Sequence, residues 1–254
     1  MPIIRLDLAY DGTGFRGWAR QRDQRTVQGV LEDAIERVLR ERPRLSVAGR
    51  TDAGVQARGQ VASFAFDADV DLQRLRRAVN GMLSPEIVVR AASPAPDGFD
   101  ARHSATAREY RYRIDIGEVP DPFTARFVWH RPGALALGAM REAARGLVGS
   151  HDFASFCRSP GEGATTVRNL QRLSISRAGD RVEISARANA FLHQMVRSLV
   201  GTLVAVGAGD LDPDSMESIL RARSRAAAGR VAPPHGLTLE RVVYGRVSPR
   251  ARPR

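Results

Sequence analysis

Apolar and polar residues alternate at the start of the chain, as they do in a β-strand with one buried face. Apolar side chains occupy every second position from Ile4 to Tyr10, and Arg5 and Asp7 lie between them. Successive side chains of a strand point to opposite faces, so this period of two predicts a strand. Short apolar runs predict further strands over residues 45–48, 60–66 and 86–92.

Two segments between these strands have the apolar period of a helix that packs one face on a sheet. The first begins after Thr26 and runs to about Arg40, and the second begins after Asp71 and stops at Ser84-Pro85. Thr and Asp accept hydrogen bonds from the first N–H groups of a helix, and a proline disfavours helix in the residue before it. The predicted buried faces are Val27, Val30, Leu31, Ala34, Ile35, Val38 and Leu39, and Leu72, Leu75, Val79 and Met82.

The second half of the chain loosely repeats this order of elements. A stretch rich in proline, glycine and charge at residues 94–103 is the best candidate for a linker between the halves. Beyond it, the patterns predict strands at 108–116, 167–177, 181–189 and 237–247, and helices at 135–147, at 190–206 and from Asp212.

The order β-α-β-β-α-β, found twice, predicts an α+β fold. Each half has the element order of a split-βαβ, or ferredoxin-like, unit. The predicted domains are therefore residues 1–103 and residues 104–247. Residues 248–254 are rich in proline and arginine and are predicted to form a basic disordered tail.

The charge of the chain favours an anionic partner. The 254 residues carry a formal net charge of +11, and the chain contains no lysine, so all 39 basic residues are arginine. A guanidinium pairs bidentately with phosphate and stacks on bases. The absence of lysine excludes a Schiff-base lysine and a P-loop lysine.

Cysteines, histidines and apolar segments together predict a cytoplasmic protein without disulfide, metal site or membrane span. Cys157 is the only cysteine, so no disulfide can form within the chain. The five histidines are scattered without metal-ligand spacing. Charges at Arg5 and Asp7 argue against a signal peptide, and the longest apolar segment, residues 199–208, is too short to cross a bilayer.

Residues 11–17 contain the glycine pattern G-x-G-x-x-G, at Gly12, Gly14 and Gly17. Dinucleotide-binding folds use this pattern, but they need a helix to open within it, and here a polar stretch follows. The alternative is a glycine-rich basic loop that faces phosphates. The arginines of this loop are Arg16, Arg20, Arg22 and Arg25.

The connection between the strands at 45–48 and 60–66 carries the strongest candidate chemistry. It reads GRTDAGVQARGQ and places Arg50, Asp52 and Gly54 close together. In an extended loop the side chains of Arg50 and Asp52 point the same way, and a guanidinium favours an ionised carboxylate. An ionised aspartate can be a nucleophile or a base, and Gly54 lets the backbone approach a substrate. An ordinary Asp-Ala-Gly turn has the same residues, so both interpretations stay open at this point.

Five segments, in the same order along the chain, resemble the TruA-type tRNA pseudouridine synthases. The loop GRTDAGVQARGQV resembles that family's GRTDAGVHA-x-GQV, and YDGTGFRGWARQ resembles its YDG-x-x-F-x-GWQ-Q segment. Further along, SATAREYRYRI, GSHDFASF and NAFLHQMVRSLVGTLVAVGAG resemble its SA-x-x-R-x-YRY strand, its G-x-HDF-x-SF turn and its F-x-H-x-MVR-x-x-VG helix. The likeness extends across most of the chain.

The resemblance implies a fold, an activity and partners. The fold would consist of two ferredoxin-like halves whose mixed or antiparallel sheets join around a basic cleft. The activity would be the isomerisation of uridine to pseudouridine at positions 38 to 40, in the anticodon arm of tRNA, without a cofactor. The family also implies a homodimer in which tRNA crosses both subunits.

Carried over by motif, the resemblance assigns roles to particular residues. Asp52 would be the catalytic residue, Arg197 would pair with it, and Arg50 would help to displace the base. Tyr110 would stack on the flipped base. The further candidates are Thr51 and Phe191 for substrate binding and Arg58 for tRNA binding.

The implied reaction makes physical demands that such residues can meet. The glycosidic bond must break, the uracil must rotate, and a carbon–carbon bond must form. The base must leave its stack at a cost of roughly a few kcal/mol, part of which an aromatic ring recovers by stacking. The carboxylate could act covalently or remove a ribose proton to give a glycal, and the sequence leaves both courses open.

The chain departs from the family pattern at a few positions. Gln56 stands where the loop has histidine, Gln194 stands where a second histidine is common, and Ala19 interrupts the GWQ element. Neither glutamine is assigned the central step, so activity is expected to survive.

Two other classes of protein share parts of these patterns. A non-catalytic protein with tandem RRM-like units has the same element order, but its RNP1 strand needs aromatic residues where Gln60 and Ala62 stand. A nucleotide-dependent oxidoreductase would need a helix after Gly17.

Overall fold

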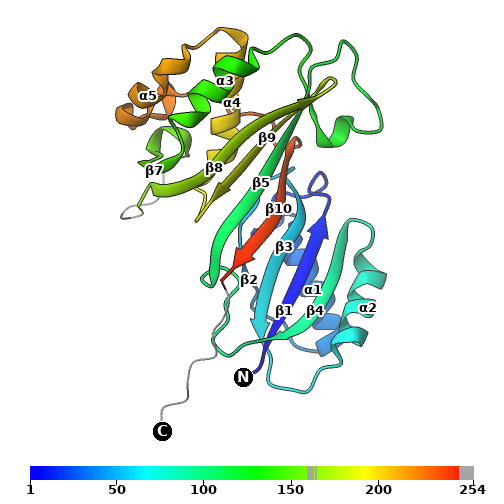
Figure 1. The fold of residues 1–254 in the computed structure, drawn as a ribbon. Coiled ribbons are helices and arrows are strands. Elements are labelled where there is room, and N and C mark those ends of the chain that lie inside the picture. The colour runs from blue at the N-terminus through cyan, green and yellow to red at the C-terminus, as the bar shows by residue number, and fades with distance from the viewer. Residues whose placement is uncertain (159–162, 164, 246–254) are drawn as a thin grey trace.

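The computed structural model describes residues 1–158, 163 and 165–245. The predicted tail at 248–254 lies outside the described residues, as do residues 246 and 247 of the predicted last strand. Within the described part, the chain has the mixed α+β composition that its sequence predicts (Figure 1).

One large and mostly antiparallel sheet runs through the molecule (Figure 1). In the described part, its strands lie in the order β4-β1-β3-β10-β5-β9-β8-β7, with β2 on β3 and β6 on β5. The pairs β3–β10 and β5–β6 are parallel, whereas the others are antiparallel. The bounds are β1 Ile3–Tyr10, β2 Ser46–Val47, β3 Gln56–Ala65, β4 Ile87–Ala95, β5 Ala105–Asp115, β6 Trp129–His130, β7 Gly149–Asp152, β8 Val167–Ala178, β9 Arg181–Ala188 and β10 Leu237–Tyr244.

β10, the last strand of the described residues, lies in the middle of the sheet. β10 pairs with β5 in antiparallel register and with β3 in parallel register, through Thr238 opposite Gln56 and Leu239 opposite Ala57. Strand β3 falls within the predicted domain of residues 1–103, and β5 falls within that of residues 104–247. β10 therefore lies between strands of the two predicted domains in one sheet.

Helices lie against this sheet in two groups (Figure 1). The α-helices are α1 Val27–Leu39, α2 Leu72–Leu83, α3 Leu137–Arg145, α4 Met195–Ala208 and α5 Met216–Ala222, and the short 3-10 helices are η1 Ala125–Phe127, η2 Ala154–Phe156, η3 Pro213–Ser215 and η4 Arg225–Ala227. Figure 1 shows α1 and α2 beside β1, β3 and β4, and α3, α4 and α5 beside the other end of the sheet. No helix in the part that the structure describes is long and apolar enough to cross a membrane.

The first two helices begin where the sequence predicts. The side chain of Thr26 accepts a hydrogen bond from the N–H of Gly29, and that of Asp71 accepts from the N–H groups of Gln73 and Arg74. The buried face of α2 is shorter than predicted: Leu75 and Val79 are buried, but Met82, in the last turn, is 40% exposed.

Two boundaries near the catalytic candidates differ from the prediction. β3 begins at Gln56 rather than at residue 60, because Gln56 and Ala57 pair with β10 and Ala57 also pairs with Tyr10 of β1. α4 begins at Met195 rather than at residue 190, because Gln194 has a φ of +63°, which interrupts a helix. Phe191 consequently lies in an irregular segment before α4.

Candidate active site

Asp52 lies in a tight turn between β2 and β3. Its carbonyl accepts a hydrogen bond from the N–H of Val55 at 3.2 Å. Gly54 has a φ of +75°, which residues with a Cβ rarely adopt, so the turn needs a glycine there. The side chain of Asp52 is 18% exposed, and a substrate can therefore still reach it.

Two basic side chains near the start of α4 contact the carboxylate of Asp52. Nη1 of Arg197 donates to Oδ2 at 2.8 Å, and Nε2 of His193 lies 3.3 Å from Oδ1. Arg197 is itself fixed, because its Nε donates to the carbonyl of Ala232 at 2.8 Å. Charge-assisted hydrogen bonds of this length are strong and directional. Both oxygens of Asp52 are thereby oriented by residues from the other half of the chain.

Tyr110 of β5 lies beside the same turn. Its hydroxyl oxygen is 3.4 Å from the place where a Cβ at Gly49 would stand. The residue is 8% exposed, and the ring of Phe191 stands edge-on to it with centroids 5.1 Å apart. Burial, together with the nearby Tyr10 and Asp52, raises the pKa of Tyr110, so its phenol is neutral at ordinary pH.

Arg50 and Thr51, the two residues before Asp52, have different surroundings. Arg50 is exposed, and its side chain makes no ion pair or hydrogen bond within the described part of the chain. The hydroxyl of Thr51 is buried and lies 2.8 Å from the hydroxyl of Tyr10, whose pKa burial raises to about 12. Thr51 therefore anchors the turn to β1, whereas Arg50 is free to contact a ligand.

The glycines of residues 11–17 pack against the back of the Asp52 turn. A Cβ at Gly12 would overlap the carbonyl of Val55, and one at Gly17 would lie 2.9 Å from the carbonyl oxygen of Thr51. The N–H of Trp18 donates to that same Thr51 carbonyl at 3.0 Å. Close backbone approach thus explains Gly12 and Gly17, the first and last glycines of the G-x-G-x-x-G pattern.

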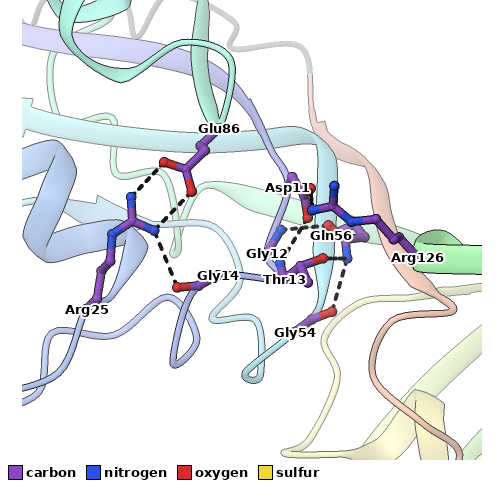
Figure 2. A network of polar contacts seen from close by, with 9 residues as sticks. All are labelled: Asp11, Gly12, Thr13, Gly14, Arg25, Gly54, Gln56, Glu86 and Arg126. Atoms are coloured by element: carbon purple, nitrogen blue, oxygen red, sulfur yellow. Dashed lines mark hydrogen bonds and ion pairs between the residues drawn. The ribbon is translucent and has the colours of Figure 1, made fainter.

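Gln56 connects the glycine loop to the Asp52 turn (Figure 2). Its Oε1 accepts from the N–H of Gly12 at 2.6 Å, and its Nε2 donates to the carbonyl of Gly54 at 3.1 Å and lies 3.4 Å from the hydroxyl of Thr13. The residue is 5% exposed. Its side chain therefore faces the protein interior rather than solvent.

The predicted tRNA-binding arginines fall into two groups. Arg16, Arg22 and Arg58 are exposed, and Arg22 contacts only the equally exposed Asp23, at 3.5 Å, among the described residues. Arg20 is paired with Glu32 at 3.1 Å. Arg25 is paired with Glu86 at 2.7 Å (Figure 2), and its guanidinium lies 4.3 Å from the ring centre of Phe15. Arg20 and Arg25 thus use some of their hydrogen-bond donors within the protein.

Sequence reasoning gave no role to His193 or to Arg108. His193 is the histidine of the segment F-x-H-x-MVR, and that motif was the signal that could have identified it. Arg108 is buried and donates to the carbonyls of Ala48 at 3.0 Å and Asn189 at 2.8 Å. Burial lowers the pKa of Arg108. Arg108 therefore braces the strand before the turn against the segment that carries His193.

The segment at 229–236 forms a further wall of the site. Its residue Ala232 fixes Arg197, and the side chain of Pro234 lies 3.1 Å from the place where a Cβ at Gly54 would stand. The hydroxyl of Tyr112 donates to the carbonyl of Pro233 at 2.7 Å. No local pattern in the sequence indicates that this segment lies at the Asp52 turn.

The solved structures that match this chain are only distantly similar to it. The archaeal box H/ACA sRNP Nop10-Cbf5 complex matches with a TM-score of 0.36 and 15% identity, over 81% of this chain and 44% of that chain. A similarity of this size adds nothing to the assignment of a family.

Sequence relatives are much closer. tRNA pseudouridine synthase A of Frankia casuarinae is 51% identical over 246 residues, which cover 95% of this chain and 89% of that protein. tRNA pseudouridine synthase A of Mesorhizobium japonicum is 46% identical over 247 residues, which cover 96% of this chain and 100% of that protein. A family model described as tRNA pseudouridine synthase matches residues 8–104 and 143–245. This chain therefore belongs to the tRNA pseudouridine synthase family.

Proposed function

We propose that this chain isomerises uridine to pseudouridine at positions 38 to 40 in the anticodon arm of tRNA, with Asp52 as the catalytic carboxylate. The observation that carries this proposal is the contact of Asp52 with Arg197 at 2.8 Å and with His193 at 3.3 Å, beside Tyr110. A carboxylate that is fixed in place, yet open to a substrate, suits a nucleophile or base. The family match and the names of the relatives support tRNA as the substrate.

The reaction rearranges the uridine without gain or loss of atoms. The bond between N1 of uracil and C1′ of ribose breaks, the uracil turns, and a bond forms between C5 and C1′. The proton on C5 leaves to water, and N1 takes up a proton. Asp52 either bonds covalently to the substrate or removes a ribose proton, and both courses need its carboxylate within reach of the nucleotide.

Aromatic residues would hold the flipped base, and Arg50 would replace it in the RNA. Tyr110 is largely covered and Phe191 stands edge-on to it, so a base that stacks on Tyr110 displaces Phe191 in part. Stacking on an aromatic ring is worth about 1–3 kcal/mol per base. Arg50 is exposed beside Asp52 and is free to enter the space that the base leaves.

The proposed substrate is a polyanion, and the charge of the chain suits it. Arg16, Arg22 and Arg58 are exposed and form the proposed phosphate contacts, to which Arg20 and Arg25 contribute with the donors that their internal partners leave free. The net charge of +11 attracts tRNA over longer distances.

The proposal includes an architecture of two ferredoxin-like halves, residues 1–103 and 104–247. The strand orders β4-β1-β3-β2 and β10-β5-β9-β8 support it, because each half then has its last strand beside its first. The halves would meet at the Asp52 turn, which Arg197 contacts from the second half. A cofactor-free reaction, a homodimer and a cytoplasmic location remain predictions from the family resemblance.

A tritium-release assay tests the proposed function. The protein is incubated with tRNA that carries tritium at C5 of uridine, and the tritium released to water is counted. Release at positions 38 to 40, mapped with tRNAs in which each uridine is replaced in turn, is the expected result. A folded protein that binds tRNA but releases no tritium would instead be a non-catalytic RNA-binding protein.

A further inference from the structure

Gln56 is a buried amide between the two loops that form the back of the site. It lies at the start of β3, three residues before Gly59 and one residue after the Asp52 turn. It uses one acceptor and one donor on different loops: Oε1 accepts from Gly12, and Nε2 donates to Gly54.

We propose that Gln56 is a positioning residue, which holds the Asp52 turn against the glycine loop and so sets the place of the Asp52 carboxylate opposite Arg197. This inference rests on the proposed function, because it concerns the reaction at Asp52. Gln56 does not contact the carboxylate and acts through Gly54, two residues after Asp52.

The packing of the two loops makes their relative position sensitive to this side chain. Gly12 and Val55 lie so close that a Cβ at Gly12 would overlap the Val55 carbonyl. A small change at this contact therefore moves the turn as a whole. The other anchors of the turn, the Trp18 N–H on the Thr51 carbonyl and the Thr51 hydroxyl on Tyr10, lie before Asp52, and Gln56 anchors the part after it.

The polarity of the amide is essential to the arrangement. Gly12 is buried, and a buried N–H without an acceptor is unfavourable. A neutral imidazole also offers one acceptor and one donor, whereas an imidazolium offers two donors and no acceptor. A histidine at this position would thus hold Gly12 only while it is neutral, but the amide of Gln56 does not titrate.

Charged groups from several elements surround this position. Asp11, Arg58, Arg113 and Arg181 line a pocket of about 360 Å³ that Gln56 also lines. Arg126 pairs with Asp11 at 2.9 Å (Figure 2). Three of the four lining charges are positive, so an imidazole introduced here would have a pKa at or below its usual value near 6.5.

Three variants of the full chain test the inference in the tritium-release assay, with kcat and KM measured from pH 5.5 to 8.5. Gln56→Leu removes both hydrogen bonds and should lower kcat by about 10- to 100-fold, as misplaced catalytic groups do, with little change in KM. Gln56→His should keep most of the activity at pH 8, and its kcat relative to the wild type should fall about tenfold below pH 6. Arg126→Gln, a neighbour in the same network that does not touch the turn, should keep the wild-type kcat.

Two results would overturn the inference. One is a wild-type kcat in Gln56→Leu. The other is a kcat of Gln56→His that keeps a constant ratio to the wild-type kcat from pH 5.5 to 8.5. This second result decides the question even where Gln56→Leu fails to fold. His193, which contacts Asp52, is present in both proteins, so its influence on kcat cancels in this ratio. Absence of tritium release from the wild type would contradict the proposed function itself and is thereby distinct from both results.

Discussion

Nη1 of Arg197 lies 2.8 Å from Oδ2 of Asp52, although 145 residues separate them in the chain. Both side chains are largely buried, at 13% and 18% exposure. Burial of either charge without the other would be unfavourable, so each charge stabilises its partner in the folded protein. This pair thus belongs to the candidate site and also links two distant parts of the chain, as β10 and Arg108 do elsewhere.

Asp52→Asn should abolish catalysis and leave tRNA binding intact. The amide keeps the size of the carboxylate but can be neither nucleophile nor base, so tritium release should fall by at least about 10²- to 10⁴-fold. Filter binding of tRNA measures the affinity. Asp69→Asn, at an exposed aspartate away from the site, is the matched control. Turnover retained by Asp52→Asn would remove Asp52 from its assigned role.

Arg197→Met should destabilise the protein through Asp52. Without the guanidinium, His193 is the one basic side chain among the described residues that still contacts the carboxylate. The expected decrease in the free energy of unfolding is about 1.5–3 kcal/mol, measured by urea denaturation. In the double variant with Asp52→Asn the loss should be smaller than the sum of the two single losses. Additive losses would show that the pair contributes no coupling energy.

Tyr110→Phe and Tyr110→Leu should differ in activity. The phenol hydroxyl has no hydrogen-bond partner within the described residues, so Tyr110→Phe keeps the stacking surface and should stay within a few-fold of the wild type. Tyr110→Leu loses the aromatic face and should lower kcat/KM by about 5- to 150-fold, the equivalent of about 1–3 kcal/mol. Equal activity of the two variants in tritium release would exclude stacking on Tyr110.

Thermal stability should depend on pH through His235. Burial lowers the pKa of His235, a hydrogen bond with the backbone of Val128 opposes this, and the nearby Arg197 lowers it further. The unfolded chain therefore takes up a proton at higher pH than the folded chain does. The contribution of His235 to stability is complete above about pH 6.5 and is lost as the pH falls below that value. Between pH 7.5 and 5, Tm should fall less in His235→Gln than in the wild type.

The salt dependence of tRNA binding should distinguish the exposed arginines from those that are paired within the protein. Arg16→Gln, Arg22→Gln and Arg58→Gln should each weaken tRNA binding and reduce the slope of log K against log salt by about 1. Arg25→Gln should change the slope less, because Glu86 already pairs with that guanidinium at 2.7 Å. A full unit of slope lost in Arg25→Gln would mean that Arg25 leaves Glu86 for the RNA.

Local patterns in the sequence predicted elements well, because caps and periods act over a few residues. Thr26 and Asp71 cap helices where they were expected to do so. The same patterns failed where distant residues decide the structure. Gln56 is a strand residue because β10 pairs with it, and that pairing joins residues 182 positions apart.

The candidate site was only partly accessible from the sequence. The motif indicated Asp52, Arg197 and Tyr110 as candidates, but not that His193 lies 3.3 Å from Asp52. The loop at 11–17 was interpreted as a basic loop whose arginines face phosphates, and its glycines were given no packing role, since a sequence shows that a glycine is present but not which backbone approaches it. Only the fold reveals that Gly12 meets Val55.

The position of β10 in the middle of the sheet has a consequence for the folding of the protein during its synthesis on the ribosome. β3 and β5 are synthesised long before residues 237–244, and the sheet order leaves a gap between them until β10 arrives. A nascent chain that ends before Leu237 thus leaves the β5 edge and the start of the β3 edge unpaired, and such edges attract other chains. The strand that follows the carboxylate turn and the strands beside the helix of the facing arginine are joined into one sheet by a segment that is translated after all of them. A nascent chain that ends before Leu237 should therefore lack activity.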